Sequence, residues 1–402
     1  MVTLTSIRAT ALLALATALM PAQAHQHQEA PAQPQSQCPA GDIRCAETVT
    51  AAFGPDGRLW RAWVSEQQLY LDSSTDVGAN FGAPLKVNAE PEAISTRGEN
   101  RPKLGFDGQG GLYLSWAMAR EQKYSADIRL SYSADGGAHF TTPRTINDDG
   151  LVAGHAFNEM LVSPDGDISL VWLDSRAKAL VPNAAAGSAV YFARGNLRRG
   201  DSQFLNSELV RGTCQCCRLA FAREPDGTQA LLWRHLYPDN VREFALLRLK
   251  EGATAQQVSF DDWQLDGCPH QGGALGISDS GRYHMTWFNA GRKGQGIFYA
   301  YSDDGGVQLS APLKVGNNQQ LASHPHLAVQ GQRVDLVWTE YNGSEQQLWW
   351  QGSTDGGALF GPARQLAASQ LGSDRPFVLT HDGKAYVSWH RPGLGHFFRA
   401  LP

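Results

Sequence analysis

The chain has 402 residues, a formal net charge of −5 and only 18% charged residues. This acidic balance offers no basic surface for nucleic acid or for an anionic membrane. The 42 glycines and 11 tryptophans are typical of a turn-rich, all-β protein rather than a helical one.

Residues 1–24 are expected to be a secretory signal peptide. Arg8 provides the positive start, the apolar run ATALLALATALM follows, and Ala22-Gln23-Ala24 is a small-residue cleavage site. The run is too short to span a bilayer, and no later stretch approaches about 18 uninterrupted apolar residues. We therefore expect a soluble protein without membrane insertion, periplasmic or secreted after cleavage near Ala24, where disulfides can form.

Residues 25–44 are expected to be a flexible N-terminal arm, because their start is rich in Gln, Pro and Ala and has no periodicity. Cleavage after Ala24 would place His25 first and His27 third. An α-amine, two backbone nitrogens and a third-residue imidazole can form a square-planar set for Cu(II) or Ni(II). His25 and His27 are thus a second possible metal site, although chance histidines in a polar tail are the simpler interpretation.

Residues 45–402 contain a repeat. A tryptophan stands near the end of each of seven alternating apolar stretches, at intervals of 51 to 61 residues. Each unit predicts a strand, a tight turn, the Trp-bearing strand and two further strands, which is one propeller blade. We expect a β-propeller of seven four-stranded antiparallel blades, with six as the alternative, and residues 43–50 completing the short last unit. The tryptophans are Trp63, Trp116, Trp172, Trp233, Trp287, Trp338 and Trp389.

A second motif, Ser-x-Asp-x-Gly-x-x-apolar, occurs four times in phase with the tryptophans. It resembles the Asp box of sialidase-type (BNR-repeat) propellers, where the box is a structural turn between the third and fourth strands of a blade. Short polar side chains tend to bond to the backbone of their own turn. The resemblance therefore implies fold elements rather than catalysts at Asp76, Asp135, Asp304 and Asp355.

In a propeller the first strand of each blade lines the central channel, so the residues that begin these strands converge on one face. The tryptophan spacing places Glu47, Arg101 and Arg375 at three such positions. Cys or His fills the others, with Met160 deeper in the same channel. The expected metal cluster comprises His155, Met160, Cys214, Cys216, Cys217, Cys268, His270, His324 and His326.

Sulfur and imidazole ligands favour copper, with zinc as the alternative. Carboxylates are scarce among these positions, which argues against calcium, magnesium or manganese. Each histidine taken alone has a simpler interpretation, as a hydrogen-bonded group at a strand end. The joint placement of the set is what favours a metal site.

An oxidising compartment favours at least one disulfide. Cys38 and Cys45 are expected to pair and to fix the N-terminal arm. The other four cysteines allow three pairings, including a bond to Cys268 that would join the fourth and fifth blades, or a strained Cys216–Cys217 bond. Even if two disulfides form, enough ligands for one ion are left in His155, His270, His324, His326 and Met160.

The resemblance to sialidases also implies an alternative function. Enzymes of that family use three arginines to clamp a carboxylate, a Tyr/Glu pair as nucleophile and helper, and an Asp as acid/base. Arg101, Arg218 and Arg375 stand where such arginines can stand. No Tyr/Glu pair can be placed with them, and the formal candidates are only Glu159, Tyr237 and Tyr341.

The sequence therefore predicts a monomeric periplasmic copper-binding protein, rather than an enzyme, for copper acquisition, delivery or buffering. Its expected partners are the metal ion and a metal-donor or acceptor protein or an outer-membrane transporter. An exo-sialidase or related glycoside hydrolase is the first alternative. A protein-binding propeller with structural disulfides only is the second.

Overall fold

The computed structural model describes residues 39–180, 188–201 and 203–402. The expectations for the signal peptide and for His25, His27 and Cys38 concern residues outside these ranges. In the part of the chain that is described, no helix has the length and apolarity needed to cross a bilayer. The secondary structure there is almost entirely β, as expected; the helical elements are α1 (Arg176–Leu180), η1 (Ile43–Cys45), η2 (Pro238–Asn240) and η3 (Asn318–Gln320).

The strands recur in a fixed order, and neighbouring strands pair antiparallel. The first strands of the successive units are β1 (Val49–Phe53), β5 (Lys103–Phe106), β9 (His155–Val162), β13 (Ala220–Arg223), β17 (Ala274–Ile277), β21 (Ser323–Gln330) and β25 (Phe377–His381). The second strands are β2 (Leu59–Ser65), β6 (Leu112–Ala119), β10 (Ile168–Asp174), β14 (Gln229–Tyr237), β18 (Tyr283–Gly291), β22 (Arg333–Tyr341) and β26 (Lys384–Arg391).

The outer strands complete the units. The third strands are β3 (Gln68–Ser74), β7 (Ala126–Ser133), β11 (Ser188–Gly195), β15 (Val241–Arg248), β19 (Gly294–Ser302), β23 (Gln346–Ser353) and β27 (Gly395–Ala400). The fourth strands are β4 (Leu85–Lys86), β8 (Arg144–Thr145), β12 (Asn206–Thr213), β16 (Gln256–Gln257), β20 (Leu313–Val315) and β24 (Arg364–Ser369).

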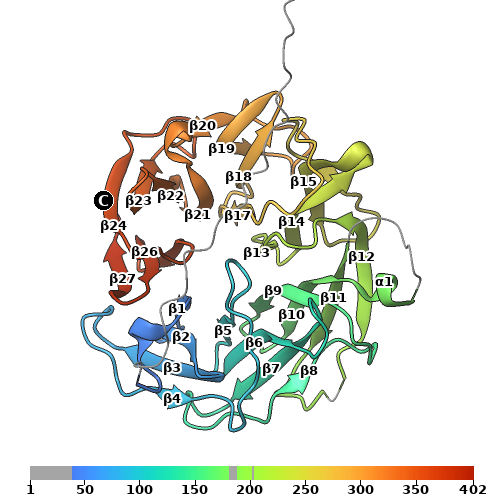
Figure 1. The fold of residues 1–402 in the computed structure, drawn as a ribbon, viewed down its shortest axis with the longest axis vertical. Coiled ribbons are helices and arrows are strands. Elements are labelled where there is room, and N and C mark those ends of the chain that lie inside the picture. The colour runs from blue at the N-terminus through green and yellow to red at the C-terminus, as the bar shows by residue number, and fades with distance from the viewer. Residues whose placement is uncertain (1–38, 181–187, 202) are drawn as a thin grey trace, which may run out of the picture. The chain divides into compact units, whose positions relative to one another are not determined.

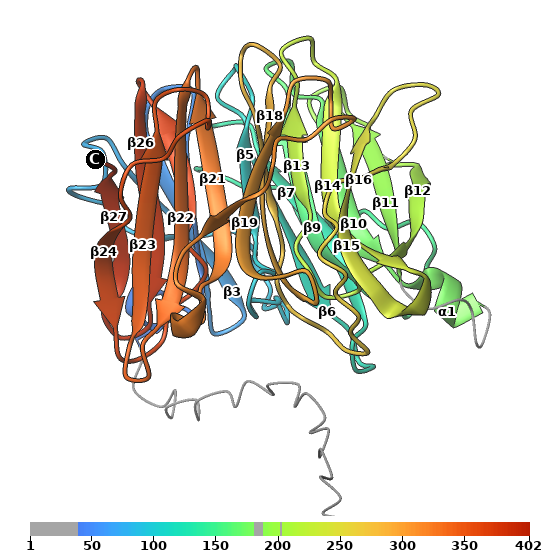
Figure 2. The same ribbon diagram turned by 90° about the horizontal axis from the view of Figure 1, so that it is seen from above.

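These strands make six sheets in the described residues. Four sheets have four strands, and the last, β25–β27, has three. One sheet has eight strands, because β9–β12 and β13–β16 are joined through a single residue pair, Thr213 with His235. The first strands contact one another in chain order, and β25 contacts β1. The sheets therefore surround a centre that the first strands line (Figure 1), and in side view they stand next to one another (Figure 2).

The segment that was expected to complete the last unit, residues 43–50, does not add a strand to it; its last two residues, Val49 and Thr50, belong to β1. Residues 43–45 are the 3-10 turn η1, which Asp42 caps by accepting a hydrogen bond from the Arg44 amide at 2.9 Å. The turn packs against β27, and the Gly393 amide donates to the Arg44 carbonyl at 2.8 Å. The sheet of β25–β27 has no fourth strand among the described residues, because a turn rather than a strand packs against β27, so the prediction for residues 43–50 was wrong.

The seven repeated tryptophans form the framework of the core. Each lies on a second strand and is at most 1% exposed. The hydrophobic clusters join neighbouring sheets: Ile128 of β7 belongs to the same cluster as Ile168 and Trp172 of β10. Burial of such large apolar side chains between adjacent sheets is the main force that holds the units together.

The Asp boxes are turns that follow the third strands, as predicted. In the first, Gly78 donates its amide hydrogen to Ser74 Oγ at 2.8 Å, and Asn80 donates its amide hydrogen to Asp76 Oδ1 at 2.8 Å. The turns at Asp135, Asp304 and Asp355 repeat this arrangement. The Ser and Asp oxygens accept hydrogen bonds from backbone amides of their own turns, so the boxes stabilise the fold.

Candidate metal centre

Three cysteines gather in the linker between β12 and β13. Cys214, Cys216 and Cys217 are 1%, 6% and 2% exposed. The Cys214 sulfur lies 3.6 Å from that of Cys216 and 3.3 Å from that of Cys217. The turn is fixed at its start because the Cys214 amide donates to the Arg234 carbonyl of β14 at 2.9 Å.

The linker between β16 and β17 adds two further donors. Cys268 and His270 are exposed, and one ligand atom of each lies within 4.8 Å of the Cys216 sulfur and of the other. His270 has left-handed backbone with a φ of 51°, a conformation that costs a non-glycine residue about 1–3 kcal/mol and often marks a functional position. Five of the nine predicted ligands therefore lie together.

The four cysteines of these two linkers are free thiols in the described structure. Neither the bond to Cys268 nor the Cys216–Cys217 bond that the sequence allowed is formed. Cys45 is disulfide-bonded, and its expected pairing with Cys38 concerns a residue outside the described ones. The cluster thus offers sulfur ligands rather than a structural link between sheets.

The electrostatics of the cluster favour a thiolate at Cys214. Hydrogen bonds from the Cys216 and Cys217 thiols hold the pKa of Cys214 well below its usual value against the effect of burial, and Arg234 and Arg242 lower it further. Arg242 donates from Nη1 to the Cys214 sulfur at 3.2 Å. A thiolate is the form of cysteine that binds metals.

The pKa values of the other thiols follow from the same contacts. The hydrogen bond to Cys214 raises the pKa of Cys216, and burial raises that of Cys217. The hydrogen bond from Cys216 lowers the pKa of Cys268 to about 6, against the effect of burial. These contacts therefore favour the thiolate at Cys214 and Cys268 and the protonated thiol at Cys216 and Cys217.

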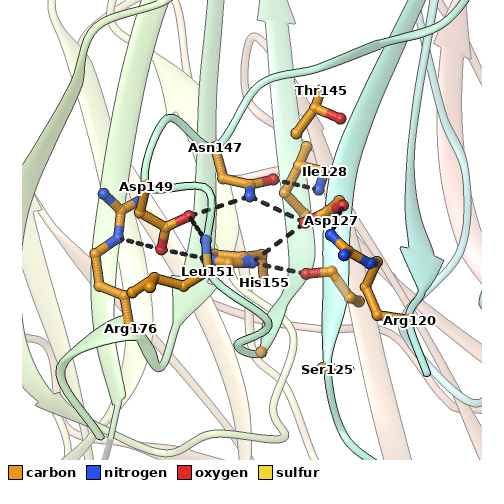
Figure 3. Close-up of polar contacts among 12 residues, drawn as sticks. Arg120, Ser125, Asp127, Ile128, Thr145, Asn147, Asp149, Leu151, His155 and Arg176 are labelled. Carbon is orange, nitrogen blue, oxygen red and sulfur yellow. Dashed lines mark hydrogen bonds and ion pairs between the residues drawn. The ribbon is translucent and has the colours of Figure 1, made fainter. Parts of the chain in front are cut away.

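His155 lies in a different polar group, next to β7 and β10 (Figure 3). Its Nδ1 faces the Ala126 carbonyl at 2.7 Å, and its Nε2 faces Asp149 at 3.0 Å. Asp149, His155 and Asp174 have donor atoms near enough for a metal, but Arg176 already pairs with both carboxylates, at 3.3 and 2.9 Å. We interpret this group as a buried ion-pair network.

Met160 and the last two histidines also lie apart from the cysteines. Met160 packs against the hydrophobic cluster between β6, β7 and β10. His324 Nδ1 lies 3.4 Å from Glu99 Oε1, and His326 accepts a hydrogen bond from the Val378 amide at 3.2 Å. These side chains have partners of their own, so the structure does not bring them into the cysteine group.

The three arginines considered for a sialidase do cluster, and two acidic groups of the protein, Asp374 and Glu99, lie beside them. Arg101 pairs with Asp374 at 3.0 Å. Arg218, Arg375 and His324 lower the pKa of Glu99 more strongly than burial raises it, so this buried carboxyl is ionised beside them. These two carboxylates would compete with a substrate carboxylate for the arginines, although they do not balance all three guanidinium charges.

The residues considered as a sialidase Tyr/Glu pair make other contacts. Glu159 pairs with Lys103 at 2.6 Å. Tyr341 is exposed and donates to the Gly343 carbonyl of its own loop at 2.9 Å, and Tyr237 stacks edge-on against His235. No Tyr/Glu pair forms among these candidates.

The sequence reasoning missed four charged residues that contact or influence the arginine and cysteine groups: Glu99, Arg234, Arg242 and Asp374. A signal existed for Glu99 and Asp374, because each lies just before an arginine, in GENRP and in SDRP. Arg234 and Arg242 carry no comparable signal, since only the pairing of β14 with β15 brings them beside the cysteine turn.

Comparisons with known proteins support the fold alone. No protein-family model and no curated protein matches the chain. Among solved structures, it is similar to the BP39L lectin from Burkholderia pseudomallei, with a TM-score of 0.58 and 9% identity over 89% of this chain and 96% of that one. The polysaccharide lyase Uly1 gives 0.55 and 12% over 94% of both chains.

A microbial sialidase, Hadza Hz136, gives a TM-score of 0.51 and 13% identity over 85% of this chain and 76% of that one. The chain is thus similar in structure to a sialidase and to other propeller proteins that act on or bind carbohydrates. At these identities the similarity does not carry a function.

Proposed function

We propose that the protein is an exported copper-binding protein that holds the metal at the linkers before β13 and β17. The observation that carries this proposal is the convergence of Cys214, Cys216, Cys217, Cys268 and His270. Four of these five donors are sulfur, and the three cysteines of the β12–β13 linker are buried. Soft thiolate ligands in a water-poor site select Cu(I) first and Zn(II) second.

The spacing of the sulfurs fits metal coordination. Two ligands joined to one ion by tetrahedral bonds of about 2.3 Å lie about 3.8 Å apart. The sulfurs of Cys214, Cys216 and Cys217 are 3.3 and 3.6 Å apart, close to this distance before any adjustment. The donors form two overlapping sets of three ligands, Cys214, Cys216 and Cys217 and then Cys216, Cys268 and His270. Cu(I) accepts three ligands, whereas structural zinc requires four.

The wider role that we propose is copper acquisition, delivery or buffering in the periplasm, after removal of the signal peptide. The exposed side of the cluster, at Cys268 and His270, gives a donor or acceptor protein access to the metal. We also propose that the structure has seven blades, the eight-stranded sheet counting as two. The seven first strands in mutual contact support this number.

The test is metal analysis of protein purified from the periplasm, followed by anaerobic titration of the reduced protein with Cu(I) and Zn(II). We expect tight Cu(I) binding that the Cys214→Ser/Cys217→Ser double variant weakens at least 100-fold. His139→Ala is the matched control, because His139 is exposed and bonds only within its Asp box. Absence of Cu(I) binding, or turnover of a fluorogenic sialoside that Arg218→Met abolishes, would overturn the proposal.

A further inference from the structure

The five sulfur and imidazole donors fall into two sets that share one atom. Cys214, Cys216 and Cys217 form the first set, and Cys216, Cys268 and His270 form the second. Within each set, the ligand atoms all lie within 4.8 Å of one another. The five donors do not form one such set, which means that a single ion cannot bind all of them without rearrangement. The shared atom is the Cys216 sulfur.

We propose that the cluster holds two Cu(I) ions, bridged by the Cys216 thiolate. This inference rests on the proposed function and adds the number of ions and their order. A thiolate has three lone pairs, so one sulfur can bind two metals at once. Each ion then has three ligands: the inner one has three sulfurs, and the outer one has two sulfurs and the His270 imidazole.

The charges of the surrounding residues fit this number of ions. Four thiolates bring four negative charges into a largely buried region, where uncompensated charge is costly. Arg242 contacts the Cys214 sulfur at 3.2 Å, and Arg234 is close enough to lower the pKa of both Cys214 and Cys217. Two Cu(I) ions and two guanidinium groups balance the four thiolates, whereas a single Cu(I) would leave one negative charge.

Burial gives the two positions an order. The inner position has only buried ligands, whereas Cys268 and His270 are exposed. A metal can therefore reach or leave the inner position by ligand exchange through Cys216, one bond at a time, and each thiol that binds releases its proton to solvent. The outer position acts as the loading site, and the inner position is the storage site.

Native mass spectrometry of the anaerobic, reduced full-length protein during titration with Cu(I) tests this arrangement. We expect two bound ions in the wild type, one in Cys268→Ser/His270→Ala and one in Cys214→Ser/Cys217→Ser. Cys216→Ser removes the bridge and should retain at most one ion, whereas His139→Ala should retain two. X-ray absorption of the doubly loaded wild type should show copper–copper scattering that is absent at one equivalent.

The outcomes separate this inference from the proposed function. A wild-type protein that saturates with one Cu(I), or with two that show no copper–copper scattering, overturns the bridged pair and leaves copper binding intact. A wild-type protein that binds none overturns both. The wild-type measurements do not depend on any variant folding. If the outer variant loads its remaining ion as fast as the wild type loads its first, the assignment of the loading site is wrong.

Discussion

The ion pair of Arg101 and Asp374 joins the beginning of the ring of sheets to its end, and its removal should be costly. Arg101 precedes β5, Asp374 precedes β25, and both side chains are 1% exposed. Arg101 also donates to the Val49 carbonyl of β1 at 3.1 Å and to the Arg375 carbonyl at 3.2 Å. The perturbation is Arg101→Met, which keeps most of the side-chain volume and removes the charge and every donor.

The expected magnitude follows from these contacts. At 3.0 Å and an effective dielectric constant of about 20, the attraction between the two charges is about 5–6 kcal/mol. Loss of one partner from a buried pair costs about 3–5 kcal/mol of unfolding free energy, because the other group must stay charged without compensation or take up a proton. We therefore expect Arg101→Met to lose about 3–5 kcal/mol at pH 7.5.

The loss should depend on pH. Burial raises the pKa of Asp374 to about 6, although Arg101 and two backbone amides pull it down. A folded-state pKa above the unfolded value means that this carboxyl favours the fold below about pH 3.8, and that its contribution is lost as the pH rises through 6. At pH 5 Asp374 is protonated, so Arg101→Met leaves no charge behind and should cost only about 1–3 kcal/mol for the two carbonyls.

Urea unfolding followed by tryptophan fluorescence, at pH 5 and pH 7.5, measures both values. Arg211→Met is the matched control, since its ion pair with Glu208 is exposed and should contribute less than about 1 kcal/mol. In the Asp374→Asn background the cost of Arg101→Met at pH 7.5 should fall by about 2 kcal/mol, because the charge partner is gone. A loss below about 1 kcal/mol, or equal losses at the two pH values, would refute this reasoning.

Four further predictions concern single regions. His155→Gln should cost about 2–4 kcal/mol in urea unfolding without changing Cu(I) stoichiometry; a lost ion would return His155 to the metal site. Burial lowers the pKa of His284 to about 4, so its contribution is complete above pH 6.5 and is lost as the pH falls to 4. Between these pH values the wild type should lose up to about 3 kcal/mol of unfolding free energy. The His284→Phe variant should not show this loss, as pH-dependent unfolding can check. Ser353→Ala removes the acceptor of the Gly357 amide and should cost about 1–2 kcal/mol; an unchanged melting temperature would contradict it. Deletion of residues 25–28 should abolish Cu(II) binding by the mature terminus and leave Cu(I) binding unchanged, as spectroscopic titration would show.

The repeat was predictable because each unit has a tryptophan at nearly the same position of its second strand. Each tryptophan fills the space between sheets, so its spacing gives the units and the order of their strands directly. The cysteines lie near one another for a related reason: they belong to linkers that precede first strands, and adjacency of those strands brings the linkers together.

His155, His324 and His326 lie apart from the cysteines because spacing locates a strand but not the direction of a side chain. Side chains alternate along a strand, and one inserted residue reverses which face each of them takes. The pairing of β9 with β10 shifts register between Val171 and Leu173 of β10. Phe157 of β9 lies at this shift and has a φ of 56°. The pairing of β21 shifts between Ser323 and His326, at His324, whose φ is 52°. A bulge near the start of a strand cannot be recognised from the sequence that precedes the tryptophan.

Two groups of reactive side chains lie near the first strands, and their partners decide between the candidate functions. The three arginines have two carboxylates, Asp374 and Glu99, and backbone carbonyls as partners within the protein. The cysteines have chiefly one another and Arg242. Thiols that mainly contact other thiols gain little from burial alone, whereas soft cations would provide them with strong ligand bonds. The cysteines therefore have bonding capacity that a soft metal would use, and this supports the proposed metal binding.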